Sequence, residues 1–389
     1  MPLLNDNVMQ GRWLRWWLTL SFAVMFTAVF LFNSRVPMLN VVDFLFFLPS
    51  LTLVTRAVVS GDHRLLSSPL LIPLYALLGW ALLSMAWAED PNGSRTVRAV
   101  VQIIAMVGLF RWLHLYYRHT FKQALTNGAL CAVIVAATVM VSYYTTQPLS
   151  SPLFSEPANL IFHLPSLDPP SALMAMLAPT FILLAQAREE GPSGKGGRRL
   201  AGALVGFAFL CLVSLPLGAM AVLLGVAVLL FGSRHHRFSL IPVILALYLL
   251  VDQSSLDTAG NYLLHPWFGN GLNLETLNEV IARQGDQLLT FSHPRNLFLL
   301  LVHTVGVIGL LLFLACWLVP LTALRQRKID WSYDRIFTAS VLPALFMLFG
   351  TGAFLLRPFQ SSWLCIWIPM ALLLARLSER DTIRPTPKR

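Results

Sequence analysis

The chain has 389 residues, of which 56% are hydrophobic and only 12% charged, and its formal net charge is +10. A composition this apolar excludes an ordinary soluble domain. Apolar runs of about 20 residues, the length that crosses roughly 30 Å of hydrocarbon, recur from end to end. Because every backbone polar group in lipid must be satisfied within its own segment, these runs predict the helices of an all-α, polytopic membrane protein.

About twelve spans are predicted in chain order, within a single transmembrane domain that covers residues 1–389. The seventh and eighth are short, and only Pro216 and Gly218 separate them, so one broken or re-entrant hairpin is an alternative for this pair. The predicted spans are 13–32, 37–55, 66–87, 97–113, 123–145, 171–187, 200–215, 217–232, 238–252, 296–320, 336–356 and 361–376.

The basic residues predict the orientation of these spans. An even number of spans places both termini on one side, and that side carries about 22 of the 28 Lys and Arg residues, so it is predicted to be cytoplasmic. The positive charge is spread over short loops between spans. It is therefore a signal of topology, and nucleic acid is not an expected partner.

The opposite side retains six arginines and no lysine, although the topology argument predicts few basic residues there. A guanidinium keeps its charge and holds phosphate by two parallel hydrogen bonds, which lysine cannot do. The set favours an anionic substrate on this face, and pairing of single arginines with nearby acids is the alternative. The arginines are Arg35, Arg95, Arg98, Arg283, Arg295 and Arg357, and the nearby acids include Glu89, Asp90, Asp252, Glu279 and Asp286.

Two loops on this side are long. Residues 146–170 are rich in Pro and Ser, and residues 253–295 form a large loop between the ninth and tenth spans. Within the large loop, 273–284 has the apolar spacing of a short amphipathic helix, with Asn273 as its N-cap and Gly285 as its stop. Such a helix on the outer membrane surface would form a lid between lipid and a polar cavity.

The segment FSHPRNLFLLLVHTVGVIG, residues 291–309, joins this loop to the tenth span. Arg295 and Asn296 fall in the first turn, where unpaired N–H groups and the helix dipole favour an anion. His303 follows Asn296 by two turns on the same face, roughly 10 Å deeper at about 1.5 Å per residue, and must face protein or water. A core His303 bonded to a carbonyl or hydroxyl, and an exposed His293, are the alternatives to functional roles.

Two segments at the ends of the large loop, HPWFGNG (265–271) and SHPRNLFLLLVHTVGVIG (292–309), carry a resemblance. They resemble the O-antigen ligase and polymerase family of membrane glycosyltransferases, which includes protein O-oligosaccharyltransferases. The family has a His-Asn pair followed by Gly-x-x-Gly, and Asn296, Gly306 and Gly309 fit that pattern. The family layout, twelve spans with one large outer loop between spans nine and ten, fits nearly the whole chain.

The chain departs from the family pattern at two positions. Arg295 stands where the family has the histidine, with His293 two residues upstream, and Leu217 stands where many members carry an arginine. Either His293, Arg295 and His303 perform the roles of the missing histidine and arginine, or the chain has altered or lost activity. The retained outer arginines favour function.

The resemblance implies transfer of an O-antigen glycan from an undecaprenyl-diphosphate carrier to a sugar hydroxyl of lipid A–core. The reaction would take place on the periplasmic face of the bacterial inner membrane, and it needs no metal or nucleotide cofactor. Polymerisation of carrier-linked repeats and transfer to protein are alternatives within the family. A transporter or non-enzymatic binding protein for lipid-linked glycan is the alternative from another class, although the sequence has no evident internal repeat and few charges near the span centres.

In this interpretation, arginines stabilise charge on the leaving diphosphate, and a histidine accepts the proton of the incoming hydroxyl. The candidate catalytic residues are His293, Arg295 and His303, and the candidates for binding diphosphate or glycan are Arg283, Asn296, Arg95 and Arg98.

Overall fold

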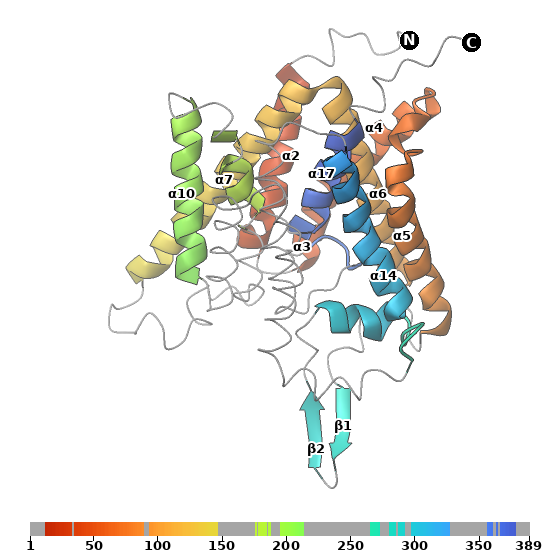
Figure 1. Cartoon of the computed structure of the whole chain (residues 1–389). Helices are drawn as coiled ribbons and strands as arrows, with labels where there is room; N and C mark the ends of the chain where they lie inside the picture. The colour runs from red at the N-terminus through yellow and green to blue at the C-terminus, as the bar shows by residue number, and fades with distance from the viewer. Residues whose placement is uncertain are drawn as a thin grey trace, which may run out of the picture.

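The computed structural model describes a helical bundle with one β-hairpin at one end (Figure 1). Among the described residues, six helical segments are long and apolar enough to cross a membrane: Trp13–Leu31, Val36–Val59, Pro69–Trp87, Gly93–Tyr116, Arg118–Thr138 and Leu300–Ala323. They coincide with the first five predicted spans and the tenth, which confirms the polytopic helical class. The described residues are 12–32, 35–88, 93–146, 176, 178–184, 186–187, 195–213, 265–272, 280–284, 287–291, 297–326, 356–360, 363–364 and 366–378.

Two of the twelve predicted spans, 217–232 and 238–252, lie outside the described residues. So do all of the predicted span 336–356 except Leu356 and all of the smaller predicted loop except Thr146. The sixth predicted span, 171–187, is helical wherever it is described. The count of twelve spans therefore stays a prediction.

The second span consists of three helical pieces that follow one another without a loop. Helix α3 (Arg35–Val42) leads into a π-helical turn (Asp43–Phe47), which leads into α4 (Leu48–Val59). The carbonyl of Leu45 inside the wide turn accepts hydrogen bonds from two side chains of α2 (Arg12–Leu31), the indole of Trp17 at 3.0 Å and the hydroxyl of Ser21 at 2.9 Å. Such turns are rare and occur often at functional sites, and here the neighbouring helix stabilises the turn.

The core is built around closely packed aromatic rings on the first, second, fourth and fifth spans. Helix α7 (Arg118–Thr146) packs along α2 (Arg12–Leu31), and Gly128 makes the close approach possible, since a Cβ there would lie 2.6 Å from the Cβ of Phe22. The Phe22 ring contacts those of Phe26, Phe46, Phe110 and Phe121.

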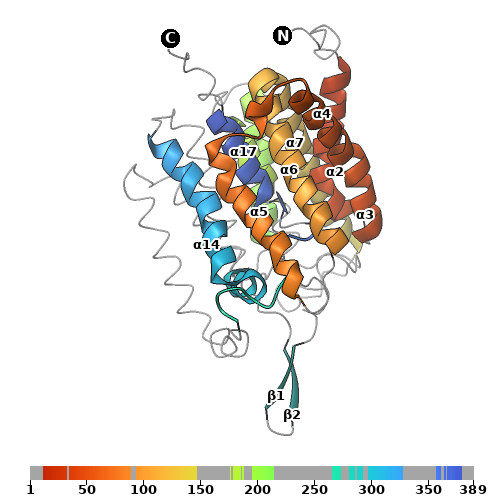
Figure 2. The same cartoon turned by 90° about the vertical axis from the view of Figure 1, so that its right-hand side faces the viewer.

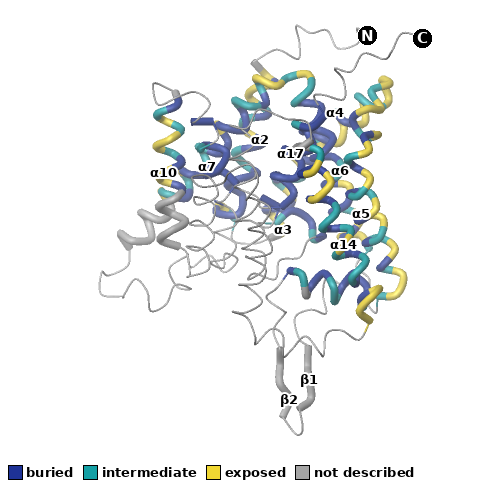
Figure 3. Tube along the Cα trace, in the orientation of Figure 1, coloured by how far each residue is buried: buried dark blue, intermediate teal, exposed yellow. Residues whose placement is uncertain are grey.

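The remaining long helices pack in pairs. Helix α6 (Gly93–Tyr116) packs against α17 (Trp367–Ser378), and α5 (Ile72–Ser84) packs against α14 (Leu297–Gln326) (Figure 2). Figure 3 shows that α17 is buried along nearly its whole length, whereas α5 and α10 (Lys195–Val213) each keep an exposed side, as helices that meet lipid would.

The two ends of the bundle differ in charge. Helix α2 begins and α17 ends at one end, and the β-hairpin lies at the other, which we call the hairpin end (Figure 1). Arg15, Arg118 and Arg376 lie near the first end, whereas the start of α6, with Arg95 and Arg98, lies at the hairpin end. Which end faces the cytoplasm stays a prediction.

The large loop contains strands where a helix was predicted. Strand β1 (Val280–Gln284) pairs antiparallel with β2 (Gln287–Phe291), from Val280 opposite Phe291 to Gln284 opposite Gln287. The helix predicted over 273–284 is therefore wrong for residues 280–284, and 273–279 lie outside the described residues. The missed signal is the Gly-Asp pair at 285–286, because two such residues between apolar runs are typical of a hairpin.

We expect Gly128→Ala to lower the melting temperature in detergent, because the added methyl group would overlap Phe22, and overpacking of this kind costs about 1–3 kcal/mol. Gly79→Ala is the matched control, because a Cβ at Gly79 on α5 meets nothing within 4 Å. Alanine also favours a helix over glycine by about 1 kcal/mol. Equal melting temperatures for the two variants would contradict the close contact between α2 and α7.

Candidate active site

Helix α14 is broken at Gly306, whose backbone adopts φ 73° and ψ −179°. Residues 297–305, which we call the transverse segment, lie across the hairpin end, and the rest of α14 rises beside α5 (Figures 1 and 2). The continuous span predicted over 296–320 is therefore wrong at its start. His303 belongs to the transverse segment, so it stays at the end of the bundle instead of lying roughly 10 Å deeper along a straight helix.

The loop 265–272 occupies the break and satisfies the backbone of the second half of α14. The N–H of Val307 donates to the carbonyl of Pro266 at 2.8 Å, and the N–H of Ile308 donates to the carbonyl of Trp267 at 3.4 Å. These two N–H groups belong to a helix start, which has no partners of its own for them. The loop carbonyls therefore accept the hydrogen bonds that carbonyls of the preceding turn accept in an unbroken helix.

The carbonyl groups before the break are satisfied from two directions. The N–H of Asn270 donates to the carbonyl of His303 at 2.8 Å, and the indole N–H of Trp80 on α5 donates to the carbonyl of Val305 at 2.8 Å. Non-helical backbone at membrane depth is tolerated where protein surrounds it, and here the loop and α5 provide the surroundings.

Glycines allow this close fit. Gly269 has φ +71°, and a Cβ there would lie 2.6 Å from the backbone nitrogen of Gly306 and the carbonyl oxygen of Thr304. A Cβ at Gly306 would overlap the carbonyl of Trp267. Gly271 has φ +85° and would meet the backbone of Ala88. Gly306, the first glycine of the Gly-x-x-Gly pattern, thus makes room for the loop 265–272.

The side chains of Asn270 and His303 also meet at the break. The amide Nδ2 of Asn270 lies 3.1 Å from the ring Nδ1 of His303, and both residues are half-buried. The expected alternative for His303 was a bond to a carbonyl or hydroxyl, whereas this contact is with a side-chain amide. A half-buried histidine with one ring nitrogen held in place has the arrangement that a general base requires.

Three aromatic rings cluster near the break, where Trp80 binds the carbonyl of Val305. The rings of Trp80, Trp87 and Phe268 lie within 5.8–6.3 Å of one another, measured between centroids. Phe268 is 55% exposed and its neighbour Trp267 is 64% exposed. Rings of this kind suit both a membrane–water boundary and contact with the apolar face of a bound molecule.

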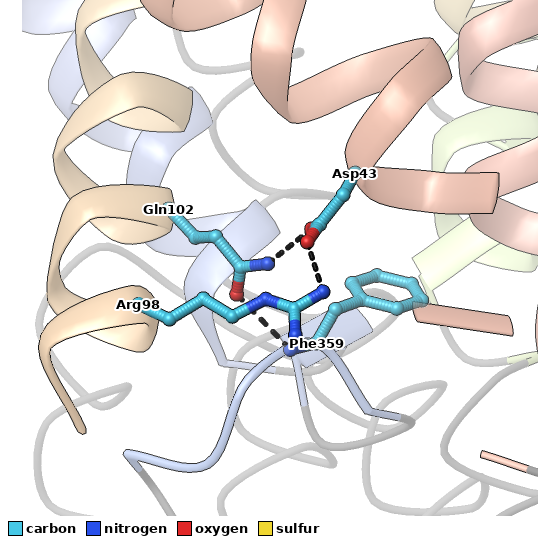
Figure 4. A network of polar contacts seen from close by, with 4 residues as sticks. All are labelled: Asp43, Arg98, Gln102 and Phe359. Carbon is cyan, nitrogen blue, oxygen red and sulfur yellow. Dashed lines mark hydrogen bonds and ion pairs between the residues drawn. The ribbon is translucent and has the colours of Figure 1, made fainter. Parts of the chain in front are cut away.

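A second polar group at the hairpin end centres on Asp43 in the π-helical turn (Figure 4). Its two carboxylate oxygens accept hydrogen bonds from the guanidinium of Arg98 and from the amide of Gln102, both on α6. The amide oxygen of Gln102 accepts in turn from the backbone N–H of Phe359 at 3.2 Å. The network ties the second span, α6 and the segment 356–360 together.

The structure places three of the seven predicted site residues with their side chains. His303 lies at the break of α14, Arg95 is exposed on the first turns of α6, and Arg98 is paired with Asp43. Arg283 lies in β1 opposite Leu288. His293, Arg295 and Asn296 lie outside the described residues. The structure therefore groups His303 with Asn270, and Arg98 with Asp43, on different helices of the same end.

Sequence reasoning missed Asp43, Gln102 and Asn270. Asp43 and Gln102 could have been found, since a polar residue inside an apolar span faces protein or a cavity and marks a site by default. Asn270 stood within the quoted segment HPWFGNG but received no role. Within the described ranges, no three His, Cys, Asp or Glu side chains gather in a way that could hold a metal ion.

We expect Gly269→Ala to destabilise the protein more than Gly61→Ala does. Both glycines have positive φ, at +71° and +95°, so both variants carry the strain of about 1–2 kcal/mol that a left-handed conformation costs an L residue. Only Gly269 faces backbone atoms, whereas a Cβ at Gly61 meets nothing within 4 Å. Thermal unfolding in detergent measures the difference, and equal losses would disprove the docking of the loop on α14.

A double-mutant cycle on Asp43 and Arg98 tests the second network. Both side chains are partly exposed, at 27% and 39%, so we expect their coupling to be only about 0.5–1 kcal/mol after screening by solvent. Asp43→Ala should lower stability more than Arg98→Ala, because it also leaves the amide of Gln102 without its acceptor. Additive losses in denaturant unfolding would show that the pair is not formed.

Comparisons with known proteins add to this geometry. No family profile matches the chain, and no solved structure matches it. The chain is similar to a protein named O-antigen ligase from Pseudomonas aeruginosa, with 26% identity over 80% of this chain and 78% of that protein. The resemblance carried by the residues around the large loop and this similarity agree, and both make the chain O-antigen ligase-like in sequence.

Proposed function

We propose that this protein is a membrane glycosyltransferase that transfers an O-antigen glycan from undecaprenyl diphosphate to a sugar hydroxyl of lipid A–core. The similarity to O-antigen ligase over 80% of the chain carries the proposal. The site at the break of α14 supports it, because His303 lies at the end of the bundle, within reach of the membrane surface where a lipid diphosphate sits.

The reaction makes one bond and breaks one. The acceptor hydroxyl oxygen bonds to the anomeric carbon of the donor sugar, the carbon–oxygen bond to the diphosphate breaks, and undecaprenyl diphosphate leaves with the electron pair. The hydroxyl proton must go to a base. Histidine suits this task because its ordinary titration range is near neutral pH, and His303 and His293 are the candidates.

The leaving group demands positive charge near the membrane surface. Arg95 is exposed at the start of α6, and we assign it to the diphosphate together with Arg283 and Arg295 from the large loop. Arg98 shares its charge with Asp43, so it contributes its remaining N–H donors more than net charge. Asn296 is assigned to the donor as well. No metal ion or nucleotide has a role in this scheme.

The orientation follows from the same proposal. The hairpin end faces the periplasm of the bacterial inner membrane, and both termini are cytoplasmic, with twelve spans in all. The positions of the described basic residues support this orientation, because Arg15, Arg118 and Arg376 lie at the end opposite the hairpin.

Other acceptors would use the same donor chemistry. A polymerase transfers the glycan to another carrier-linked repeat, and a protein O-oligosaccharyltransferase transfers it to a protein hydroxyl. The name of the similar protein favours lipid A–core as the acceptor here. In a deletion strain, loss of all long chains from lipid A–core, with carrier-linked polymer accumulating, would support this acceptor, whereas single-repeat caps would indicate a polymerase.

We expect His303→Ala to reduce glycan transfer by about 100-fold or more, the usual contribution of a general base. The assay uses purified protein in liposomes with undecaprenyl-diphosphate-linked O-antigen and lipid A–core. His119→Ala is the control, because His119 is exposed at the start of α7, at the opposite end of the bundle. Unchanged transfer in His303→Ala would remove His303 from the mechanism and leave His293 as the base.

A further inference from the structure

We propose that Asn270 is a positioning residue that holds Nδ1 of His303, so that Nε2 is the ring nitrogen that takes the proton of the acceptor hydroxyl. The inference rests on the proposed function of His303 as the base. It goes further, because it assigns a role to a loop residue that lies 33 positions away in the sequence.

Two hydrogen-bond contacts between Asn270 and His303 carry the inference. The backbone N–H of Asn270 donates to the carbonyl of His303 at 2.8 Å, and the side-chain amide lies 3.1 Å from the ring Nδ1. The first bond fixes the distance between the two backbones, and the second fixes the direction of the ring. A contact at a ring nitrogen restricts the staggered rotamers that a histidine side chain can adopt.

The loop is itself held in place on both sides of Asn270. Gly269 approaches the backbone of Thr304 and Gly306, and Gly271 approaches Ala88, both more closely than any residue with a Cβ could. The amide therefore sits on a rigid support, which is what a group that positions another side chain requires.

The described contact at Nδ1 of His303 is with an amide. Of the helices packed against α14, α5 carries Tyr75 as its one titratable side chain, bonded to the carbonyl of Leu66, and α17 carries Arg376 at the opposite end. The described loop carries His265, which is exposed. Among the described contacts, the one at Nδ1 of His303 is with the amide of Asn270, at 3.1 Å.

An amide suits both states of a base. When the neutral ring carries its proton on Nε2, the Nδ2–H of Asn270 donates to Nδ1; when Nδ1 carries a proton, the amide oxygen takes the same position after a rotation of 180°. In the second arrangement Nε2 carries no proton and can accept that of the hydroxyl. The amide oxygen of Asn270 then still accepts a hydrogen bond from Nδ1–H of the imidazolium that results.

The test compares two variants of similar shape. Asn270→Leu can neither donate nor accept, and we expect transfer to fall about 10- to 100-fold, as when the partner of a metal-bound histidine is removed. Asn270→Asp can only accept, so it keeps the proton on Nδ1, and we expect it to retain transfer. Both variants keep the backbone N–H that bonds to His303.

The dependence of rate on pH separates positioning from a structural role. The carboxylate in Asn270→Asp stabilises the imidazolium, so the ring stays protonated to higher pH, and the acid limb of the profile should move to higher pH. An unmoved acid limb in Asn270→Asp, or wild-type transfer in Asn270→Leu, would overturn the inference. If Asn270→Leu does not fold, the profile of Asn270→Asp alone decides.

The failure of the inference and that of the proposed function are distinguishable. Full transfer in His303→Ala means that the ring is not the base, and the role of Asn270 falls with it. Lost transfer in His303→Ala, together with an unchanged profile in Asn270→Asp, overturns only the role of Asn270.

Discussion

A helix in a membrane can be interrupted only where other groups satisfy the backbone that the interruption leaves open. In this protein the loop 265–272 and Trp80 satisfy α14 at Gly306, and the rest of the site follows from that contact. The break turns the transverse segment across the end of the bundle, which keeps His303 at the surface. The same contact brings Asn270 to the ring of His303, and the same loop carries the exposed rings of Trp267 and Phe268.

At the hairpin end, an acidic side chain partly neutralises the positive charge of the arginines. Asp43 cancels much of the charge of Arg98 and joins the second span to α6 and to the segment 356–360. This network stabilises the arrangement of three segments, while Arg95 remains exposed two turns from Gln102. Arg98 is paired with Asp43, whereas Arg95, one turn earlier on the same helix, is exposed.

The sequence predicted the features that depend on composition and on the length of apolar runs. It failed for the features that depend on contacts between distant segments. Apolar length was enough to locate six spans, because hydrocarbon thickness sets it. The break at Gly306 could not be predicted, since a glycine inside an apolar run fits a straight helix equally well until the loop that replaces its bonds is known. The strands at 280–284 and 287–291 were missed because the apolar spacing of 273–284, which is typical of a helix, outweighed the turn signal of the Gly-Asp pair.

The break also constrains how the protein can be synthesised and inserted. The indole of Trp80 and the carbonyl of Val305 that it binds are 225 residues apart, and the loop leaves the ribosome before α14 does. The backbone groups at the break of α14 have no hydrogen-bond partners within the helix. We therefore expect the insertion of α14 to depend on α5 and the loop, which supply these partners. The contact at this end therefore joins parts of the chain that are synthesised far apart in time.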